Sequence, residues 1–268
     1  MNISATISQL YFYENIDMLL LITVRCTGFF VLLPIFSGAN IPAQTKIALG
    51  LFMSYIVFTS GIAAECTYDP TTFGYFYLLI IEFLTGFVLA FAVYAAFMVF
   101  FLAGQLIDYQ IGYSMVSVLD PVSQIQVPVT GNLIYMFIML FLIQTGGLNH
   151  IVGAFLHGFE VVPLGSAAFL SNASLIDTAI ASIVSYFVIA VKIAMPVVGT
   201  ILVLDVALGI LVKAAPQMNI FVVGMPIKLL IGLIVFLVVI PMFSFVYEIV
   251  FSESYKNFHN FLEGMRTG

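Results

Sequence analysis

Apolar residues follow one another in long runs along this chain, and the runs are spaced like the helices of a membrane protein. Six segments stand out, at residues 18–36, 47–64, 73–107, 133–143, 176–212 and 220–251. A helix needs about 20 apolar residues to cross the ~30 Å hydrocarbon layer of a bilayer. The pattern therefore predicts an all-α, polytopic integral membrane protein.

Some of these segments do not fit a simple crossing. The charge-free part of the third, residues 83–107, would form about 38 Å of helix, so it must tilt, break or project beyond the lipid. The fourth would form only about 16 Å before a Gln-Thr-Gly-Gly sequence at 144–147 interrupts it. Pro196, Pro226 and Pro241 lie inside the last two segments, where proline bends a helix. We therefore expect long, kinked and broken helices.

Composition narrows the class of protein further. Of 268 residues, 63% are apolar and 7% are charged, against roughly 25% charged in a typical soluble domain. Mean hydropathy is +1.19. So few charges cannot cover a soluble surface, and 7 basic residues against 13 acidic ones give no basic face for nucleic acid. A soluble enzyme, a disordered chain and a nucleic-acid binder are excluded.

The stretch from residue 104 to residue 132 is polar but uncharged over much of its length. Pro121 and Pro128 forbid a continuous helix there, and its glycines permit turns. No Asp, Glu, Lys or Arg occurs between residues 121 and 159. Broken, uncharged backbone of this kind is typical of segments that are buried in protein or line a cavity at membrane depth. A plain surface loop remains the alternative.

Charged residues inside the apolar segments are costly, at roughly 2.5–3.5 kcal/mol for a charge at a helix centre. Arg25 therefore favours an interior partner, with Glu82, Asp108 and Asp205 as candidates; the alternative is that it snorkels to the interface. Arg25, Glu82, Lys192 and Asp205 could also form the polar pathway of a secondary transporter, which is the second functional hypothesis.

Residues that could carry catalysis or bind a metal are scarce. His150 and His157 are seven positions apart, with Glu160 following, whereas metal ligands on one helix are usually three or four apart. Cys26 lies in an apolar run and Cys66 in a polar loop, so neither a disulfide nor a metal cluster is expected. The sequence predicts no enzyme activity and no cofactor.

Three stretches, taken in order and spacing on a chain of this length, resemble a known family. They are Arg25, Pro34, Pro42 and Lys46 with the following Ile-Ala-Leu-Gly-Leu run; Gly104-Gln105, Gln110-Ile111-Gly112, Asp120-Pro121, Pro128-Val129 and Val162-Pro163-Leu164-Gly165; and Leu208-Gly209, Ala215-Pro216-Gln217-Met218-Asn219-Ile220-Phe221 and Gly224-Met225-Pro226-Ile227-Lys228. This arrangement resembles the FliR family of flagellar biosynthetic proteins, export-gate components of type III secretion systems.

The resemblance implies a particular organisation. Residues 1–170 would be a part similar to FliP, and residues 171–268 a helical hairpin similar to FliQ with a C-terminal tail. The family is non-enzymatic and assembles with FliP and FliQ into a pore in the bacterial inner membrane, within the flagellar basal body, through which unfolded export proteins pass. Membrane lipid is the other expected contact, and the flagellar and virulence-associated systems are not distinguished.

The resemblance also implies site residues. A loop at residues 112–128 would plug the pore, and its carried-over positions are Gly112, Tyr113, Ser114, Met115, Val116, Ser117, Val118, Leu119, Asp120, Pro121 and Pro128. The hairpin turn would face the cytoplasm and contact FlhB through Lys213, Pro216, Gln217, Asn219 and Lys228, which agrees with the positive-inside rule for its lysines. Asp108 departs from the family pattern, because a small residue is common at its position, and this puts the packing below the plug in doubt.

Overall fold

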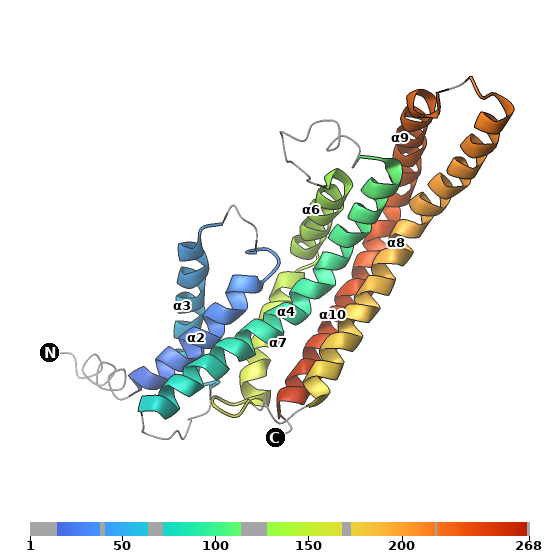
Figure 1. The fold of residues 1–268 in the computed structure, drawn as a ribbon. Helices are drawn as coiled ribbons and strands as arrows, with labels where there is room; N and C mark the ends of the chain where they lie inside the picture. The colour runs from blue at the N-terminus through green and yellow to red at the C-terminus, as the bar shows by residue number, and fades with distance from the viewer. Residues whose placement is uncertain are drawn as a thin grey trace. The chain divides into compact units, whose positions relative to one another are not determined.

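The structure, a computed structural model, describes residues 15–37, 41–63, 72–113, 128–167, 173–217 and 219–266. Every regular element within these ranges is helical, as the apolar pattern predicts (Figure 1). In chain order the elements are α2 (Ile16–Leu32), α3 (Ala43–Ser60), α4 (Thr72–Ile111), α6 (Val129–Gln144), α7 (Gly147–Val161), α8 (Ala173–Ala214), α9 (Ile220–Val239), the 3-10 helix η1 (Ile240–Met242) and α10 (Phe243–Arg266).

Three of the helical segments are long and apolar enough to cross a membrane, namely residues 73–111, 175–214 and 222–266. The broken pair α6 and α7 adds a fourth if the two helices are taken as one span. This is fewer than the six apolar runs of the sequence. The first two apolar runs form the shorter helices α2, with 17 residues, and α3, with 18 residues, and the first turn of α3 contains the polar residues Gln44, Thr45 and Lys46.

The described chain packs as two compact units, each assembled from separate stretches of sequence. The first unit comprises residues 1–94, 146–181 and 254–268, and the second comprises residues 95–145 and 182–253. These units are defined by packing, whereas the division at residue 170 rests on resemblance, so the units do not test that division.

In the first unit, α2 packs against α3 and against the beginning of α4. Thr27 of α2 lies against Gly50 of α3, where a Cβ would come 2.7 Å from the threonine oxygen. On the same pair of helices, the Thr23 hydroxyl donates a hydrogen bond to the Ser54 hydroxyl, at 2.9 Å. A glycine opposite a threonine lets the helix backbones approach closely, which is the usual packing of helices in membranes.

In the second unit, α8 and α9 form an antiparallel hairpin (Figure 1). Helix α8 covers the fifth apolar segment, and α9 covers the first part of the sixth, which continues through residues 240–242 into α10. The turn between α8 and α9 contains Pro216 and Gln217. Pro196 lies inside α8 and Pro226 inside α9, yet both helices continue past them. At residues 240–242 the chain passes through η1, which contains Pro241, before α10 begins. Only this last proline interrupts the regular α-helix.

Helix α4 is longer and more regular than the sequence suggested. It runs unbroken through residues 104–111, a stretch we expected to contain turns. Gly104 does not form a turn, because it lies within the helix and lets α4 pack closely against α6. A Cβ at this position would collide with the backbone of Gly131 in α6. The helix ends at Ile111, and the φ of 99° at the following Gly112 is in the left-handed region that favours glycine.

The break after the fourth apolar segment lies where the sequence placed it. Helix α6 ends at Gln144, and α7 begins at Gly147 after Gly146 takes a φ of 68°. The Thr145 hydroxyl forms two hydrogen bonds at the end of α6. It donates to the Phe141 carbonyl at 2.8 Å and shares a 2.8 Å hydrogen bond with the Tyr247 hydroxyl. The Thr145 hydroxyl therefore connects the end of α6 to α10.

Candidate functional site

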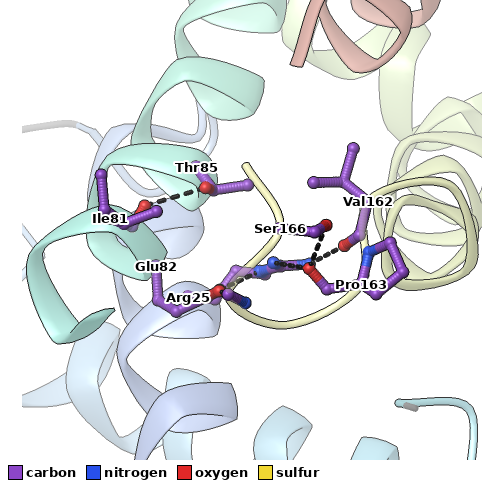
Figure 2. A network of polar contacts seen from close by, with 8 residues as sticks. Arg25, Ile81, Glu82, Thr85, Val162, Pro163 and Ser166 are labelled. Atoms are coloured by element: carbon purple, nitrogen blue, oxygen red, sulfur yellow. Dashed lines mark hydrogen bonds and ion pairs between the residues drawn. The ribbon is translucent and has the colours of Figure 1, made fainter. Parts of the chain in front are cut away.

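The first unit contains a buried ion pair between helices α2 and α4. Arg25 Nε donates to Glu82 Oε2, and the two side chains are only 1% and 0% exposed (Figure 2). Glu82 was one of three partners that the sequence offered for Arg25. The pair joins residues far apart in the chain, so it fastens α2 to α4.

The loop after α7 completes this cluster. Arg25 Nη1 donates to the Val162 carbonyl at 2.8 Å, and Nη2 donates to the Pro163 carbonyl at 3.4 Å. Figure 2 shows Arg25 between Glu82 of α4 and these two carbonyls. The other carboxylate oxygen of Glu82, Oε1, accepts the backbone N–H of Gly165, at 2.7 Å. Both charges therefore have several hydrogen bonds. A buried ion pair is tolerated when its remaining polar atoms are satisfied in this way.

Aromatic rings and close helix contacts surround the ion pair. The Arg25 guanidinium carbon lies 4.7 Å from the centre of the Phe159 ring, within the range of a cation–π interaction. Phe29 stacks on Phe155, with ring centres 4.0 Å apart. A Cβ on Gly86 would collide with the Arg25 carbonyl, so the backbones of α2 and α4 touch at the level of the charges. The cluster is closed to solvent and serves to hold three segments together.

The ends of the predicted plug loop lie in the second unit, and Asp108 ties both of them. Its carbonyl accepts the N–H groups of Gly112 and Tyr113, at 3.2 and 3.0 Å, where α4 ends. Its buried side chain accepts the N–H of Thr130 at 3.0 Å from one carboxylate oxygen and 3.2 Å from the other, in the first turn of α6. The first N–H groups of a helix have no partner within it, so Asp108 caps α6 from α4.

Of the predicted plug residues, the structure describes Gly112, Tyr113 and Pro128. Pro128 immediately precedes α6, and its carbonyl accepts the N–H of Asn132, at 3.0 Å. The other predicted plug residues, Ser114, Met115, Val116, Ser117, Val118, Leu119, Asp120 and Pro121, lie outside the described residues. Their role remains a prediction.

Four of the five residues predicted for the hairpin turn are exposed around it. Lys213 lies in the last turn of α8, Pro216 and Gln217 form the turn, and Asn219 precedes α9. The Asn219 carbonyl accepts the N–H groups of two residues in the first turn of α9. Lys228 differs, because it lies inside α9 and not in the turn. The exposed end of the hairpin thus combines one cation with two amide side chains.

Lys228 forms an ion pair with Asp205 across the hairpin. Its ammonium group contacts Asp205 Oδ1, and the amide of Gln110 in α4 donates to Asp205 Oδ2, at 3.4 Å. The side chains of the pair are 27% and 34% exposed. Lys192 lies exposed on α8. Of the four charges considered for a transporter pathway, three are therefore engaged in ion pairs, Arg25 with Glu82 and Asp205 with Lys228.

Sequence reasoning missed several of these contacts. It treated Asp108 as a possible partner of Arg25 and as a departure from a family pattern, whereas the carboxylate caps a helix that begins 21 positions later, at Val129. The sequence analysis also gave Gln110 no role beyond its place in the Gln110-Ile111-Gly112 motif. The one available signal was that an acidic residue at the end of a 40-residue apolar helix needs a donor nearby. Which donor it finds depends on the fold.

The helices, their hydropathy and their buried ion pair define an all-α, multi-pass membrane protein. Comparison of the sequence with protein families shows a match of residues 16–254 to the family described as bacterial export proteins, family 1. The matched range begins with α2 and extends into α10. The chain belongs to this family, and the resemblance read from its motifs is confirmed.

Individual relatives agree with the family match. The flagellar biosynthetic protein FliR of Bacillus subtilis is 30% identical over 245 residues, which is 91% of this chain and 93% of that protein. FliR of Escherichia coli strain K12 is 29% identical over 92% of this chain and 90% of its own length. The surface presentation of antigens protein SpaR of Shigella flexneri is 26% identical over 83% and 86%, respectively. Family and helices together make the chain a multi-pass protein of the bacterial inner membrane.

Proposed function

We propose that this chain is the FliR-type subunit of a type III protein export gate, serving a flagellar basal body. In this role it assembles with FliP and FliQ into a pore for unfolded export proteins, contacts FlhB and catalyses no reaction. The observation that carries the proposal is the extent of the match, since the family and its FliR relatives cover about nine tenths of the chain. FliR of Bacillus subtilis and FliR of Escherichia coli, at 30% and 29% identity, are more similar to this chain than SpaR of Shigella flexneri at 26%, which favours the flagellar system.

The architecture supports this proposal in two ways. Helices α8 and α9 form the hairpin expected of the part similar to FliQ, with Lys213 and Gln217 exposed at its turn. In addition, Asp108 holds the end of α4 and the beginning of α6 together, and these are the two ends of the loop proposed to plug the pore. A loop with anchored ends can occupy a pore without leaving it.

The first test of the proposal is the composition of the purified complex. The chain should be expressed with the other genes of its export apparatus, purified in a mild detergent and analysed by mass spectrometry of the intact assembly. We expect FliP and FliQ to co-purify in fixed proportion. A homo-oligomer that lacks both, under conditions in which both are expressed, would overturn the proposed assembly.

A further inference from the structure

The last turn of α4 contacts three other helices of the second unit through three of its residues. Asp108 reaches α6 at Thr130, Gln110 reaches α8 at Asp205, and Ile111 reaches α9 at Gly232. At 100° per residue, Asp108 and Gln110 point about 200° apart around the helix, so they hold it from nearly opposite sides.

The α8–α9 hairpin contacts the last turn of α4 at one polar and one apolar position. On the polar side, Lys228 of α9 pairs with Asp205 of α8, and the same carboxylate accepts the Gln110 amide at 3.4 Å. On the apolar side, Ile111 fills the space that glycine leaves at position 232, where a Cβ would lie 2.6 Å from the isoleucine Cγ1. Ile111 is 4% exposed, so its position is fixed by α9.

The attachment of α6 to the same turn has two points. One is the backbone contact between Gly104 and Gly131, one turn before Asp108. The other is the Asp108 carboxylate on the Thr130 N–H. The glycine contact acts as a pivot, because two backbones in direct contact can rotate but cannot approach further. The carboxylate is the point that fixes the angle, because a hydrogen bond is lost when its donor turns away.

We propose that Asp108, Gln110 and Ile111 form a joint through which the position of the α8–α9 hairpin sets the separation between the end of α4 and the beginning of α6. Displacement of the hairpin would move Gln110 and Ile111, twist the last turn of α4 and withdraw the Asp108 carboxylate from Thr130. The terminal turn of a helix is the part that unwinds most readily, so this turn can respond without disturbing the rest of α4. The joint itself concerns only these four helices, and its bearing on gating rests on the proposed function.

The separation can be measured directly with spin labels. Tyr109 in α4 and Val129 in α6 are 75% and 58% exposed, so both accept a nitroxide at an introduced cysteine, with Cys26 and Cys66 replaced by serine. The labelled full-length chain is purified with its co-expressed partners, reconstituted in nanodiscs and examined by dipolar EPR. We expect a narrow distance distribution in the protein with the joint intact.

Two changes in the hairpin, neither on α4 nor on α6, test the coupling. Lys228→Met removes the ion pair, and Gly232→Val fills the space occupied by Ile111. Both should broaden the distance distribution between the labels. The exchange Asp205→Lys with Lys228→Asp keeps the ion pair, and the Gln110 amide can turn its oxygen to accept from the ammonium group, so this protein should keep the narrow distribution. Gly209→Ala on α8, where a Cβ meets nothing within 4 Å, should leave the distribution unchanged.

The outcomes separate this inference from the proposed function. Folded Lys228→Met and Gly232→Val proteins that keep the narrow distribution would overturn the joint. Gly232→Ala gives the milder version of the second change in case the valine protein does not assemble. Ion leak is measured on the same samples. A broadened distribution without any leak would leave the joint standing and would count against plugging by the segment between α4 and α6.

Discussion

At the residue scale, Arg25 and Glu82 show how a membrane protein accommodates full charges. The pair is almost completely buried, and the carbonyls of Val162 and Pro163 together with the N–H of Gly165 satisfy its remaining atoms. Breaking such a pair is far more costly than replacing it as a whole, because one unpaired charge remains in an apolar environment.

Arg25→Met should therefore lower the free energy of unfolding by about 3–5 kcal/mol, since it leaves the Glu82 carboxylate unpaired. The double variant Arg25→Met with Glu82→Met should recover part of this loss. The measurement is the temperature at which monodisperse protein is lost from size-exclusion chromatography in a mild detergent. His157→Gln, which breaks the exposed contact with Glu160, is the control and should change nothing. A double variant less stable than Arg25→Met would argue against a charge effect.

At the element scale, helices of the first unit approach one another at glycines. A Cβ on Gly28 would lie 2.6 Å from the Phe83 carbonyl oxygen, and one on Gly86 would collide with the Arg25 carbonyl. These two glycines face each other's helices, so α2 and α4 touch backbone to backbone. Membrane helices gain most from such contacts because lipid supplies no hydrophobic force between them.

Gly86→Ala should push α2 away from α4 and destabilise the fold by about 1–3 kcal/mol, since the added methyl group meets backbone that cannot move aside. The matched control is Gly153→Ala in α7, where a Cβ meets nothing within 4 Å. That variant should be neutral or stabilising by up to about 1 kcal/mol, because alanine favours helix over glycine. Both are measured by the same thermal assay, and equal effects of the two changes would refute the contact.

The hairpin α8–α9 is the other element with a functional assignment to test. A photoreactive amino acid at Lys213 or at Gln217 should give an adduct with FlhB in living cells, because both side chains are exposed at the turn. The same probe at Val206, 65% exposed on the apolar flank of α8, is the control and should give no FlhB adduct. If the turn positions trap only lipid or FliP, the assignment of the turn to FlhB is wrong.

At the scale of the whole molecule, helix length and bilayer thickness disagree. Helix α8 has 42 residues, or about 63 Å of helix, against a hydrocarbon layer of ~30 Å. Only 28% of its most apolar 18-residue stretch is buried. A hydrocarbon layer of this thickness cannot cover the whole of an exposed apolar helix of this length. This agrees with the proposed assembly and with the low number of charges in the chain.

The proposed plug gives the prediction at this scale. Replacing residues 114–127 by a Gly-Ser segment of equal length keeps Gly112, Tyr113 and Pro128, and with them the contacts of Asp108. We expect the export complex to assemble in normal yield and the membrane to become permeable to small ions. Conductance of the purified complex in planar bilayers is the measurement. Normal assembly with unchanged conductance would contradict the plug.

Several features of the fold followed from the sequence alone. The all-α class and the break at residues 144–147 were expected from apolar runs, prolines and glycines, whereas a helical hairpin near the C-terminus was expected from the family resemblance. The six apolar runs of the sequence correspond, among the described residues, to three long apolar helical segments, or to four when α6 and α7 are taken as one span. Gly104 was expected at a turn and instead lies inside α4 against Gly131. A glycine permits both uses, and only the neighbouring helix decides between them.

The sequence by itself determined that this is a membrane protein, that it is helical and to which family it belongs. These properties depend on composition, on the length of apolar runs and on the order of motifs. Only the tertiary structure decided which polar groups meet. Burial obliges Arg25 and Asp108 to find partners, but it does not say that one finds the end of α7 and the other the beginning of α6. The reason is physical: the cost of removing a charge from water is local, whereas its compensation comes from residues that are distant in the chain and adjacent only after folding.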